Sequence, residues 1–286
     1  MNVKSIIKRL LHAVQPTTVV HTNIQVLQPS DYLKGRVALI TGGTSGIGYA
    51  IAKAYLNAGA NVIITGRTDD RLVRACNELS ITSMGGGKCK TLVLDNQDVA
   101  SIPAKIKNAV SLFGRIDILV NNAGVLGGYI SNSTESEYDA VLDTNLKGVF
   151  FLSKEIGHYY KDNNIKGNIL NIASSSSLRP AASAYTISKW GIRGLTLGLA
   201  KVLAPYGITV NGIAPGQTAT PMLRSTKNLN NIAAPKTPIG RFALPEEIAN
   251  MAVIMVSDMG RLIMGDIVYM TGGVGNLTNE DLTWWF

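Results

Sequence analysis

The chain has 286 residues, of which 46% are hydrophobic and 16% charged, so its composition is far from that of disordered proteins and permits one large domain or two small ones. Lys and Arg number 27 against 19 Asp and Glu, and this net charge of +8 admits nucleic acid, an anionic membrane or a small phosphorylated ligand as a partner. Two cysteines and three scattered histidines exclude a disulfide framework and a metal-ligand cluster and favour a reducing compartment, and no apolar run reaches the roughly 18 residues of a membrane-spanning helix.

Residues 1–34 differ in charge and pattern from the rest of the chain. Apolar residues recur there at helical spacing between basic residues, and the first acidic residue is Asp31. One interpretation is a basic amphipathic helix that binds an anionic membrane surface or directs the chain to an organelle. The other is a helix that packs on its own protein or on a partner subunit. We expect a cytoplasmic protein, with a peripheral membrane or organelle location as the alternative.

From residue 35 the pattern becomes regular, because short apolar runs rich in β-branched residues alternate with helical patterns. Buried strands separated by helices indicate parallel pairing with right-handed crossovers. We therefore predict one α/β domain over residues 35–286, a doubly wound parallel seven-stranded sheet with helices on both faces. The predicted strands are 36–41, 61–65, 90–95, 116–120, 168–173, 208–213 and 267–270. The predicted helices include 47–58, 102–113, 138–159, 185–203 and 246–256.

A glycine-rich segment, Thr41-Gly42-Gly43-Thr44-Ser45-Gly46-Ile47-Gly48, joins the first predicted strand to the first helix. Glycines there let the backbone approach a pyrophosphate, and the helix start supplies free N–H groups and the positive end of a dipole. The glycine spacing differs from the usual dinucleotide fingerprint. A P-loop is excluded, because Tyr49 and Ala50 stand where that motif needs Lys and Ser or Thr. The segment therefore predicts a dinucleotide site.

The end of the second strand, Gly66-Arg67, bears on the choice of cofactor. NAD sites normally place a carboxylate about 20 residues beyond the glycines, where it holds the ribose hydroxyls. A carboxylate repels a 2′-phosphate, whereas a guanidinium pairs with it. We therefore predict NADP (NADPH) rather than NAD, the alternative being that Arg67 lies in solvent at a strand end. Asp69 and Asp70 are predicted to begin a helix rather than to bind ribose.

Tyr185 and Lys189 are four residues apart and therefore share one face of the predicted helix 185–203. A free tyrosine has a pKa near 10, too high for efficient proton transfer at neutral pH, and a nearby ammonium lowers that pKa. Such a phenol can protonate an alkoxide formed by hydride delivery, or deprotonate an alcohol in reverse. By itself a Tyr–Lys pair is more often a solvated helix face, so its meaning depends on its neighbours along the chain.

Those neighbours occur in one order: Thr-Gly-xxx-Gly-x-Gly at 41–48, Asn121-Asn122-Ala123-Gly124, Asn145, Ser174, Tyr185-xxx-Lys189 and Pro215-Gly216. This order closely resembles the short-chain dehydrogenase/reductase family over residues 34–274. The resemblance implies a Rossmann fold and an NAD(P)-binding catalytic domain. It also implies an oxidoreductase that acts on CH–OH donors and carries no metal.

By this resemblance Tyr185 is the catalytic acid/base, Lys189 lowers its pKa and binds the nicotinamide ribose, and Ser174 hydrogen-bonds the substrate carbonyl. Asn145 would hold a water that links Lys189 to solvent. The other residues implied in cofactor binding are Gly42, Thr44, Ser45, Gly46, Ile47, Gly48, Arg67, Asp95, Asn96, Asn122, Ala123, Gly124, Ile213, Pro215, Gly216, Thr218 and Thr220.

The position of the serine differs from the family pattern. The family usually places it about thirteen residues before the tyrosine, which here is Ile172. Alignment on the end of the predicted strand selects Ser174 instead, with Ser175 as an alternative. A second departure is Asn96, which follows Asp95 where a hydrophobic residue is common.

Within the family the pattern is most like that of 3-oxoacyl-acyl-carrier-protein reductases, with sugar and polyol dehydrogenases as the alternative. An acyl carrier protein is acidic, so a basic face would favour its docking; a CoA thioester is the other carrier that we consider. Two features weigh against a carrier protein. Tyr206 stands where those reductases often have an arginine, and the predicted lid, residues 218–238, is mostly small and polar. The resemblance also implies a homotetramer or homodimer.

Other classes of function fit the residues less well. A catalytically silent scaffold has no need for Ser174, Tyr185, Lys189 and Asn145 together. Nucleic-acid binding lacks a basic run or an aromatic platform, and a hydrolase lacks Gly-x-Ser-x-Gly. We therefore expect a small-molecule carbonyl or alcohol substrate and a phosphorylated cofactor, without a nucleic-acid partner or a transmembrane segment.

Overall fold

The computed structural model describes residues 31–222, 232–234, 237–275 and 277. The amphipathic helix predicted within residues 1–34 lies outside these residues, and only residues 31–34 of that extension are described. Within the described part of the chain, no helix has the length and apolarity needed to cross a membrane.

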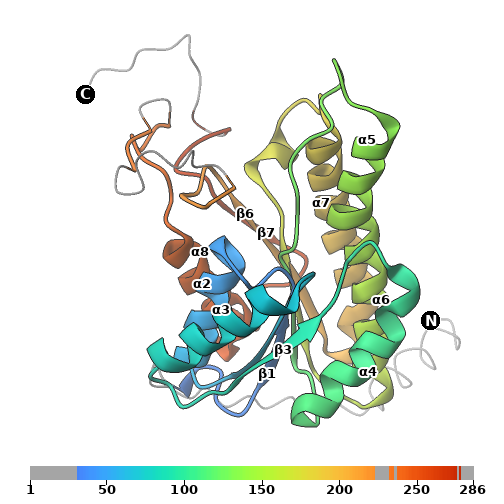
Figure 1. Ribbon diagram of the computed structural model, residues 1–286, viewed down its shortest axis with the longest axis vertical. Coiled ribbons are helices and arrows are strands. Elements are labelled where there is room, and N and C mark those ends of the chain that lie inside the picture. Colours follow the sequence, from blue (N-terminus) through green and yellow to red (C-terminus); the bar gives the residue numbers. More distant parts are fainter. Residues whose placement is uncertain (1–30, 223–231, 235–236, 276, 278–286) are drawn as a thin grey trace, which may run out of the picture.

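Seven parallel strands form one sheet in the order β3-β2-β1-β4-β5-β6-β7, which confirms the predicted doubly wound architecture (Figure 1). Each strand lies within one or two residues of its predicted ends, because short β-branched runs alternating with helical patterns are typical of parallel strands. The strands are β1 (Val37–Ile40), β2 (Asn61–Gly66), β3 (Cys89–Val93), β4 (Ile118–Asn121), β5 (Asn168–Ile172), β6 (Thr209–Pro215) and β7 (Ile267–Met270).

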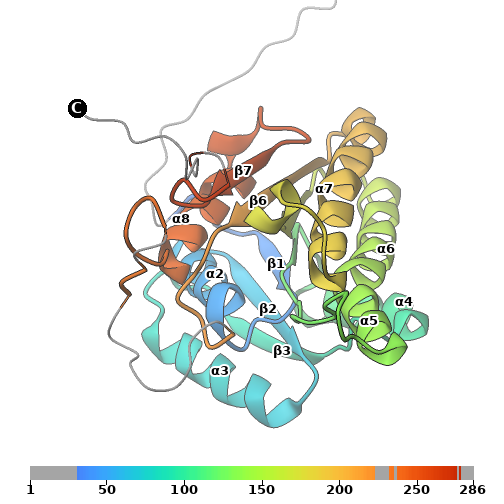
Figure 2. The ribbon, with the colours of Figure 1, turned by 90° about the horizontal axis from the view of Figure 1, so that it is seen from above.

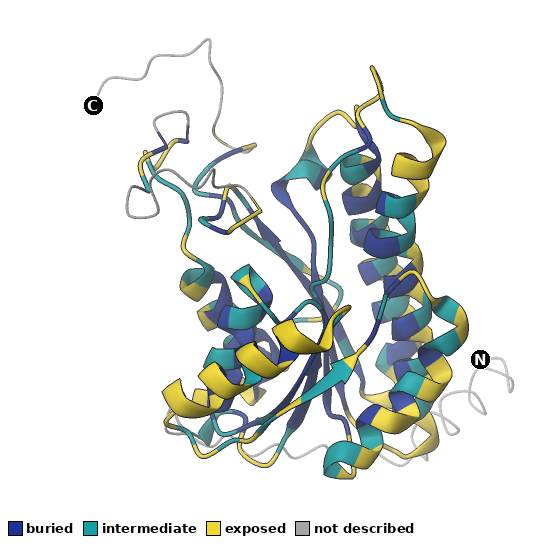
Figure 3. Ribbon diagram, viewed as in Figure 1, coloured by how far each residue is buried: buried dark blue, intermediate teal, exposed yellow. Residues whose placement is uncertain are grey.

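Helices cover both faces of the sheet, as Figure 2 shows from above. One hydrophobic cluster joins the sheet to α2, α3 and α8, and a second joins it to α4, α6 and α7. Neighbouring strand residues alternate between the clusters, so Leu39 packs on one side and Ile40 on the other. The five inner strands are therefore largely buried, whereas the edge strands β3 and β7 are partly exposed and the outer faces of the helices are exposed (Figure 3). The helices are α2 (Gly46–Asn57), α3 (Asp69–Thr82), α4 (Ile102–Phe113), α5 (Glu135–Leu142), α6 (Gly148–Asp162), α7 (Ala184–Leu203) and α8 (Pro245–Val256).

The helix predicted over residues 138–159 differs from the structure. It is interrupted by a π-helical turn, Asp143–Lys147, so that α5 and α6 are separate elements. The turn contains Asn145, whose side chain bonds the backbone of Val125 in the loop after β4. Hydrophobic periodicity cannot reveal one extra residue in a helical turn, and such turns often occur next to functional sites.

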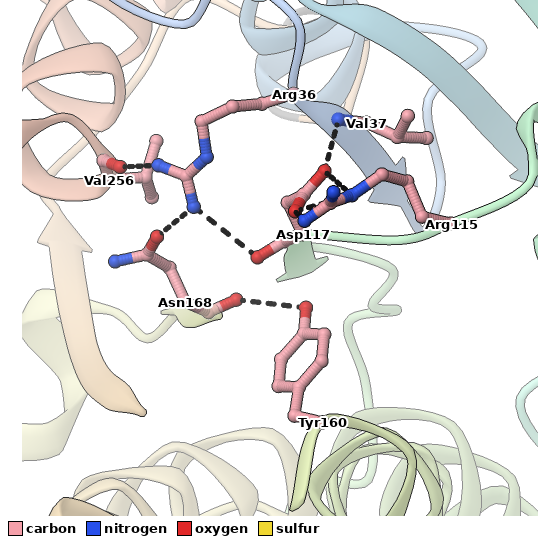
Figure 4. A network of polar contacts seen from close by, with 7 residues as sticks. All are labelled: Arg36, Val37, Arg115, Asp117, Tyr160, Asn168 and Val256. Carbon is pink, nitrogen blue, oxygen red and sulfur yellow. Dashed lines mark hydrogen bonds and ion pairs between the residues drawn. The ribbon is translucent and has the colours of Figure 1, made fainter. Parts of the chain in front are cut away.

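A polar network connects the amino-terminal ends of three neighbouring strands (Figure 4). Asp117, just before β4, accepts hydrogen bonds from the Val37 backbone N–H and the Arg115 Nε, each at 2.9 Å. Arg36 donates to the side chain of Asn168 and to the carbonyl of Val256 at the end of α8. Burial lowers the pKa of Arg36, and the nearby Asp117 raises it. The network connects β1, β4, β5 and α8 at the amino-terminal ends of the strands.

We expect Asp117→Ala to lower the free energy of unfolding by about 3 kcal/mol, because it leaves the Val37 N–H unpaired and removes the negative charge beside the buried Arg36. Arg115→Ala is the matched control. It removes the other partner of Asp117, but its side chain is 54% exposed and the cost should stay below about 1 kcal/mol. Urea unfolding of both variants measures the difference, and equal losses would contradict this assignment.

Candidate functional site

A cavity of about 370 Å³ opens where the carboxyl ends of the parallel strands meet. Its walls come from the segments that follow β1, β2, β3, β4, β5 and β6 and from the first turns of α2 and α7. These segments are far apart in the sequence, and they come together because parallel strands have all their carboxyl ends on the same side of the sheet. The predicted site residues that line this cavity are Gly42, Thr44, Ser45, Gly46, Ile47, Arg67, Asp95, Asn96, Asn122, Ala123, Gly124, Ser174, Tyr185, Lys189, Pro215, Gly216, Thr218 and Thr220.

The glycine turn places the start of α2 against the cavity. Gly42 has φ of +66°, and a Cβ there would lie 3.0 Å from the Cα of Ala123. Ser45, the residue before α2, makes no side-chain capping hydrogen bond, and the first turn of α2 contains no acidic residue. The first N–H groups of α2 therefore have neither a capping side chain nor a nearby carboxylate, an arrangement that suits an anionic ligand.

Asn122 joins the ends of β1 and β4. Its Nδ2 donates to the carbonyl oxygens of Thr41 (2.9 Å) and Gly42 (3.1 Å). In return, the Thr41 hydroxyl oxygen accepts hydrogen bonds from the backbone N–H groups of Asn122 and Ala123, both at 3.0 Å. These bonds hold the glycine turn and the loop after β4 at a constant separation.

Two arginines line the cavity on its β2 side, two strands away from β5, the strand that leads to Ser174. Arg67 follows β2, and Arg71 lies in the first turn of α3, which begins at Asp69 as predicted. Both side chains are exposed, and among the described residues neither forms an ion pair. Sequence reasoning identified Arg67 but missed Arg71 and the neighbouring Thr68. The only signal for Arg71 was its place in the first turn of the helix after Arg67.

Ser174, Tyr185 and Lys189 meet on the β5 side of the cavity. Ser174 follows β5 and lies near enough to Tyr185 for its hydroxyl to influence the pKa of the phenol. The Lys189 ammonium lies 5.7 Å from the centroid of the Tyr185 ring and donates to the carbonyl oxygen of Ile172 at 2.8 Å. Ser175 does not line the cavity, and Ile172 contributes its carbonyl, so Ser174 is the serine that the fold brings to the tyrosine.

Burial controls the protonation of these groups. It raises the pKa of Tyr185, and the nearby Ser174 hydroxyl partly offsets this rise. It lowers the pKa of Lys189 to about 8, since the ammonium is enclosed by protein. The lysine is therefore poised to change charge near neutral pH, and the phenol is held in its protonated form.

Three predicted residues do not line the cavity. Ile213 is fully buried in β6, and Gly48 lies inside α2, where a Cβ would meet Asn122 Nδ2 at 2.4 Å. Asn145 is occupied by protein: its Nδ2 donates to Val125 O (2.9 Å) and its Oδ1 accepts from Val125 N (2.8 Å). Its amide thus positions the loop after β4, and the water relay expected of it stays a prediction.

The mouth of the cavity includes residues that the sequence analysis did not select. Leu126 follows the Asn121–Gly124 segment, and Met222 follows Thr220; both are large, apolar and about half exposed. Residues 223–231 and 235–236 of the predicted lid lie outside the described residues. Within the described residues, no group of three or more His, Cys, Asp or Glu side chains is placed to hold a metal ion.

Comparison with known proteins gives consistent results. The family model for short chain dehydrogenases matches residues 36–231. The chain is 36% identical over 250 residues to a 3-oxoacyl-acyl-carrier-protein reductase of Thermotoga maritima, covering 85% of this chain and 98% of that protein. It is 34% identical over 248 residues to glucose 1-dehydrogenase 2 of Bacillus subtilis, covering 85% of this chain and 95% of that protein.

Solved structures agree with these sequence matches. A short chain dehydrogenase from Burkholderia cenocepacia, solved in complex with NADP, superposes with a TM-score of 0.75 at 30% identity. The superposition covers 84% of this chain and 98% of that one.

We expect Gly48→Ala to lower the free energy of unfolding by about 1–3 kcal/mol, because the added methyl group collides with Asn122 and with the carbonyl oxygen of Gly42. Gly198→Ala is the matched control inside α7, where no atom lies within 4 Å of the added Cβ. That variant should gain up to about 1 kcal/mol from helix propensity. Urea unfolding compares the two, and a stabilised Gly48→Ala protein would contradict the close approach.

Proposed function

Because the chain belongs to the short-chain dehydrogenase/reductase family, we propose that it is an NADPH-dependent oxidoreductase that reduces a carbonyl to a secondary alcohol, with a 3-oxoacyl thioester as substrate. One observation carries the proposal. A single cavity is lined by Ser174, Tyr185 and Lys189 on its β5 side and by two arginines on its β2 side, with β1 and β4 between them. That separation matches a long cofactor whose reactive ring and whose phosphate-bearing ribose are at opposite ends.

The chain's own residues fit NADPH. The start of α2, which lacks a capping side chain and a carboxylate, suits the pyrophosphate. Arg67 and Arg71 suit a 2′-phosphate, because guanidinium groups bind phosphate oxygens through charge-assisted hydrogen bonds. Asp95 is at the cavity wall, but its Oδ1 accepts from the Gln97 backbone N–H at 3.0 Å, which supports a role in shaping the adenine end. NAD, which lacks the 2′-phosphate, would leave both arginines unused.

When bound, NADPH supplies the hydride; the protein supplies the proton and the orientation. Tyr185, kept protonated by burial, donates its phenolic proton to the carbonyl oxygen as negative charge develops there. Ser174 holds the same oxygen by a hydrogen bond, and Lys189 stabilises the phenolate that remains. In the reverse direction the same groups remove the proton from an alcohol.

The mouth of the cavity supports an acyl substrate over a sugar. Leu126 and Met222 present apolar side chains to the cavity, and burying an alkyl chain against them is favourable, whereas a sugar's hydroxyl groups would lose hydrogen bonds to water. Sugar dehydrogenation is the second candidate, favoured by the nearly equal identity to the Bacillus subtilis glucose dehydrogenase.

The surroundings of Tyr206 bear on the carrier of the acyl group. Tyr206 precedes β6, so it lies at the amino-terminal ends of the strands, on the opposite side from the cavity. The Lys161 ammonium lies 5.3 Å from the centroid of its ring, and Lys166 lines the same surface hollow. Two lysines thus supply positive charge next to the position where an arginine was expected. Because this surface lies at the opposite ends of the strands from the cavity, the two lysines do not decide how an acyl group is delivered, and an acidic carrier protein and a CoA thioester are the two carriers that we propose.

A homotetramer or homodimer is part of the proposal. Phe150, Trp190, Leu197 and Val202 expose apolar surface along α6 and α7, the two long helices on one side of the sheet (Figure 2). Exposed apolar surface of this extent supports burial against another copy of the chain.

The direct test is NADPH oxidation with a 3-oxoacyl-CoA, with glucose and a polyol assayed as alcohol substrates with NADP. We expect turnover of the thioester, and we expect Tyr185→Phe to lower kcat at least about 100-fold with unchanged NADPH affinity, because only the proton donor is lost. Tyr129→Phe is the matched control, since Tyr129 is exposed and does not line the cavity. Tight NADPH binding without turnover of any substrate would favour a silent scaffold, and preferential oxidation of glucose would favour the second candidate.

The cofactor proposal has its own test. Arg67→Ala should raise KM for NADPH by about 10- to 100-fold, the effect of one charge-assisted hydrogen bond, and leave KM for NADH unchanged. Arg74→Ala is the control one turn further along α3, where the side chain is exposed and bonds the carbonyl of Asp70. Steady-state kinetics with both cofactors decides, and equal efficiency of wild type with NADH and NADPH would refute recognition of the phosphate.

A further inference from the structure

Ser174 is followed by a short 3-10 turn, Ser175–Leu178, which bears on the orientation of its hydroxyl group. The Ser174 Oγ accepts a hydrogen bond from the backbone N–H of Ser176 at 3.1 Å. A serine hydroxyl has two lone pairs and one hydrogen, so this bond occupies a lone pair and leaves the hydrogen to be donated elsewhere. Because Ser174 lines the cavity, the turn favours a hydroxyl that acts there as a donor.

A further serine of the turn, Ser177, bonds back to Ser174. The Ser177 side chain is fully buried, and its Oγ donates to the carbonyl oxygen of Ser174 at 2.8 Å. The Ser177 backbone N–H donates to the same carbonyl oxygen at 3.0 Å. These two bonds fix the peptide group that follows Ser174, and that peptide group leads directly to the N–H that holds the Ser174 Oγ.

Tyr269, in the edge strand β7, supports Ser177 from outside the turn. Its hydroxyl oxygen lies 3.2 Å from the Ser177 Oγ. Because Ser177 gives its one hydroxyl hydrogen to the Ser174 carbonyl oxygen, Tyr269 is the donor of this bond. The hydrogen bonds therefore run in one direction, from Tyr269 to Ser177 and from Ser177 to Ser174.

The helix that carries Tyr185 also holds the turn. From α7, the Arg193 guanidinium donates to the carbonyl oxygen of Ser177 at 3.4 Å. The Trp190 indole Nε1 donates to the carbonyl oxygen of Arg179, just after the turn, at 2.8 Å. The turn that follows Ser174 and the helix that bears Tyr185 are thus held at a fixed separation.

We propose that Ser177 and Tyr269 are positioning residues for carbonyl reduction: they hold the Ser174 hydroxyl in the orientation that donates its hydrogen to the substrate oxygen. The inference rests on the proposed function, because it concerns the same reaction. Neither Ser177 nor Tyr269 lines the cavity, so each acts through Ser174. A donor held in place before the reaction stabilises the negative charge that develops on the substrate oxygen better than one that must first reorient.

Removal of the Ser177 hydroxyl tests the inference. With NADPH and a 3-oxoacyl-CoA, we expect Ser177→Ala to lower kcat about 10-fold, because the Ser174 hydroxyl is no longer held towards the substrate. The NADPH dissociation constant, measured by fluorescence titration, should stay within about twofold of the wild-type value.

Ser257→Ala is the matched control. Ser257 is also buried, and its Oγ donates to the carbonyl oxygen of Ile254, three residues earlier, at 2.9 Å. It lies just after α8 and does not line the cavity. This variant should lose a similar amount of stability in urea unfolding and keep the wild-type kcat. An equal fall of kcat in both variants would overturn the proposal.

A double-mutant cycle separates positioning from a general effect on the fold. Ser174→Ala removes the group that Ser177 positions, so adding Ser177→Ala to it should not lower kcat further. Multiplied losses in the double variant would overturn the proposal, and so would a wild-type kcat in Ser177→Ala alone.

Tyr269→Phe is a milder variant, because it removes one hydroxyl group and keeps the ring. We expect kcat to fall about threefold, and no further fall when Ser174→Ala is present. This second cycle decides the question if Ser177→Ala does not fold, and a wild-type kcat in Tyr269→Phe would overturn the role of Tyr269. A wild type that turns over no substrate refutes the proposed function and this inference together, whereas an active wild type with multiplied losses refutes the inference alone.

Discussion

The hydrogen bonds between Thr41 and Asn122 are the constraint on which the site depends. β1 pairs with β2 on one side and with β4 on the other, so the chain segments leaving β1 and β4 turn to opposite faces of the sheet. A crevice opens where they separate. The four bonds that tie Thr41 and Gly42 to Asn122 and Ala123, at 2.9–3.1 Å, hold the two strand ends together and keep the crevice at one width. The loop after β4 is also held in place, because the Asn145 side chain bonds the backbone N–H and carbonyl of Val125 in that loop.

Polar groups are paired differently at the two ends of the strands. At the amino-terminal ends, Arg36, Asp117 and Asn168 are paired with one another and with backbone groups, which stabilises the packing of β1, β4 and β5. At the carboxyl-terminal ends, Lys189 is buried as Asp117 and Asn168 are, but its hydrogen-bond partner is a neutral carbonyl. Burial without an anion lowers the pKa of its ammonium to about 8. Burying an ammonium group without an anion costs free energy of folding, and the lowered pKa brings its proton exchange close to neutral pH.

Much of the fold and of the site follows from the residues alone. The seven strands are evident as β-branched runs, and the order of the glycine turn, the Asn121–Gly124 segment, Ser174 and Tyr185 is enough to indicate the family. Less evident are features that depend on contacts between distant segments. The interruption of 138–159 by a π-helical turn accompanies the bond between Asn145 and Val125, and Arg71 becomes a candidate only because α3 lies beside the cavity. The choice of Ser174 over Ser175 requires the position of Tyr185.

The sequence by itself determined the fold class and the family, because both depend on local patterns: the period of the apolar residues, the turn residues and the order of short motifs such as Tyr185-xxx-Lys189. Tertiary structure alone decided how those groups are tuned and what else lies near them. Burial, which sets the pKa values of Tyr185 and Lys189, is a sum over segments from the whole chain. Spacing along a chain records which residues share an element, whereas dielectric environment and contacts between elements arise only when the elements pack.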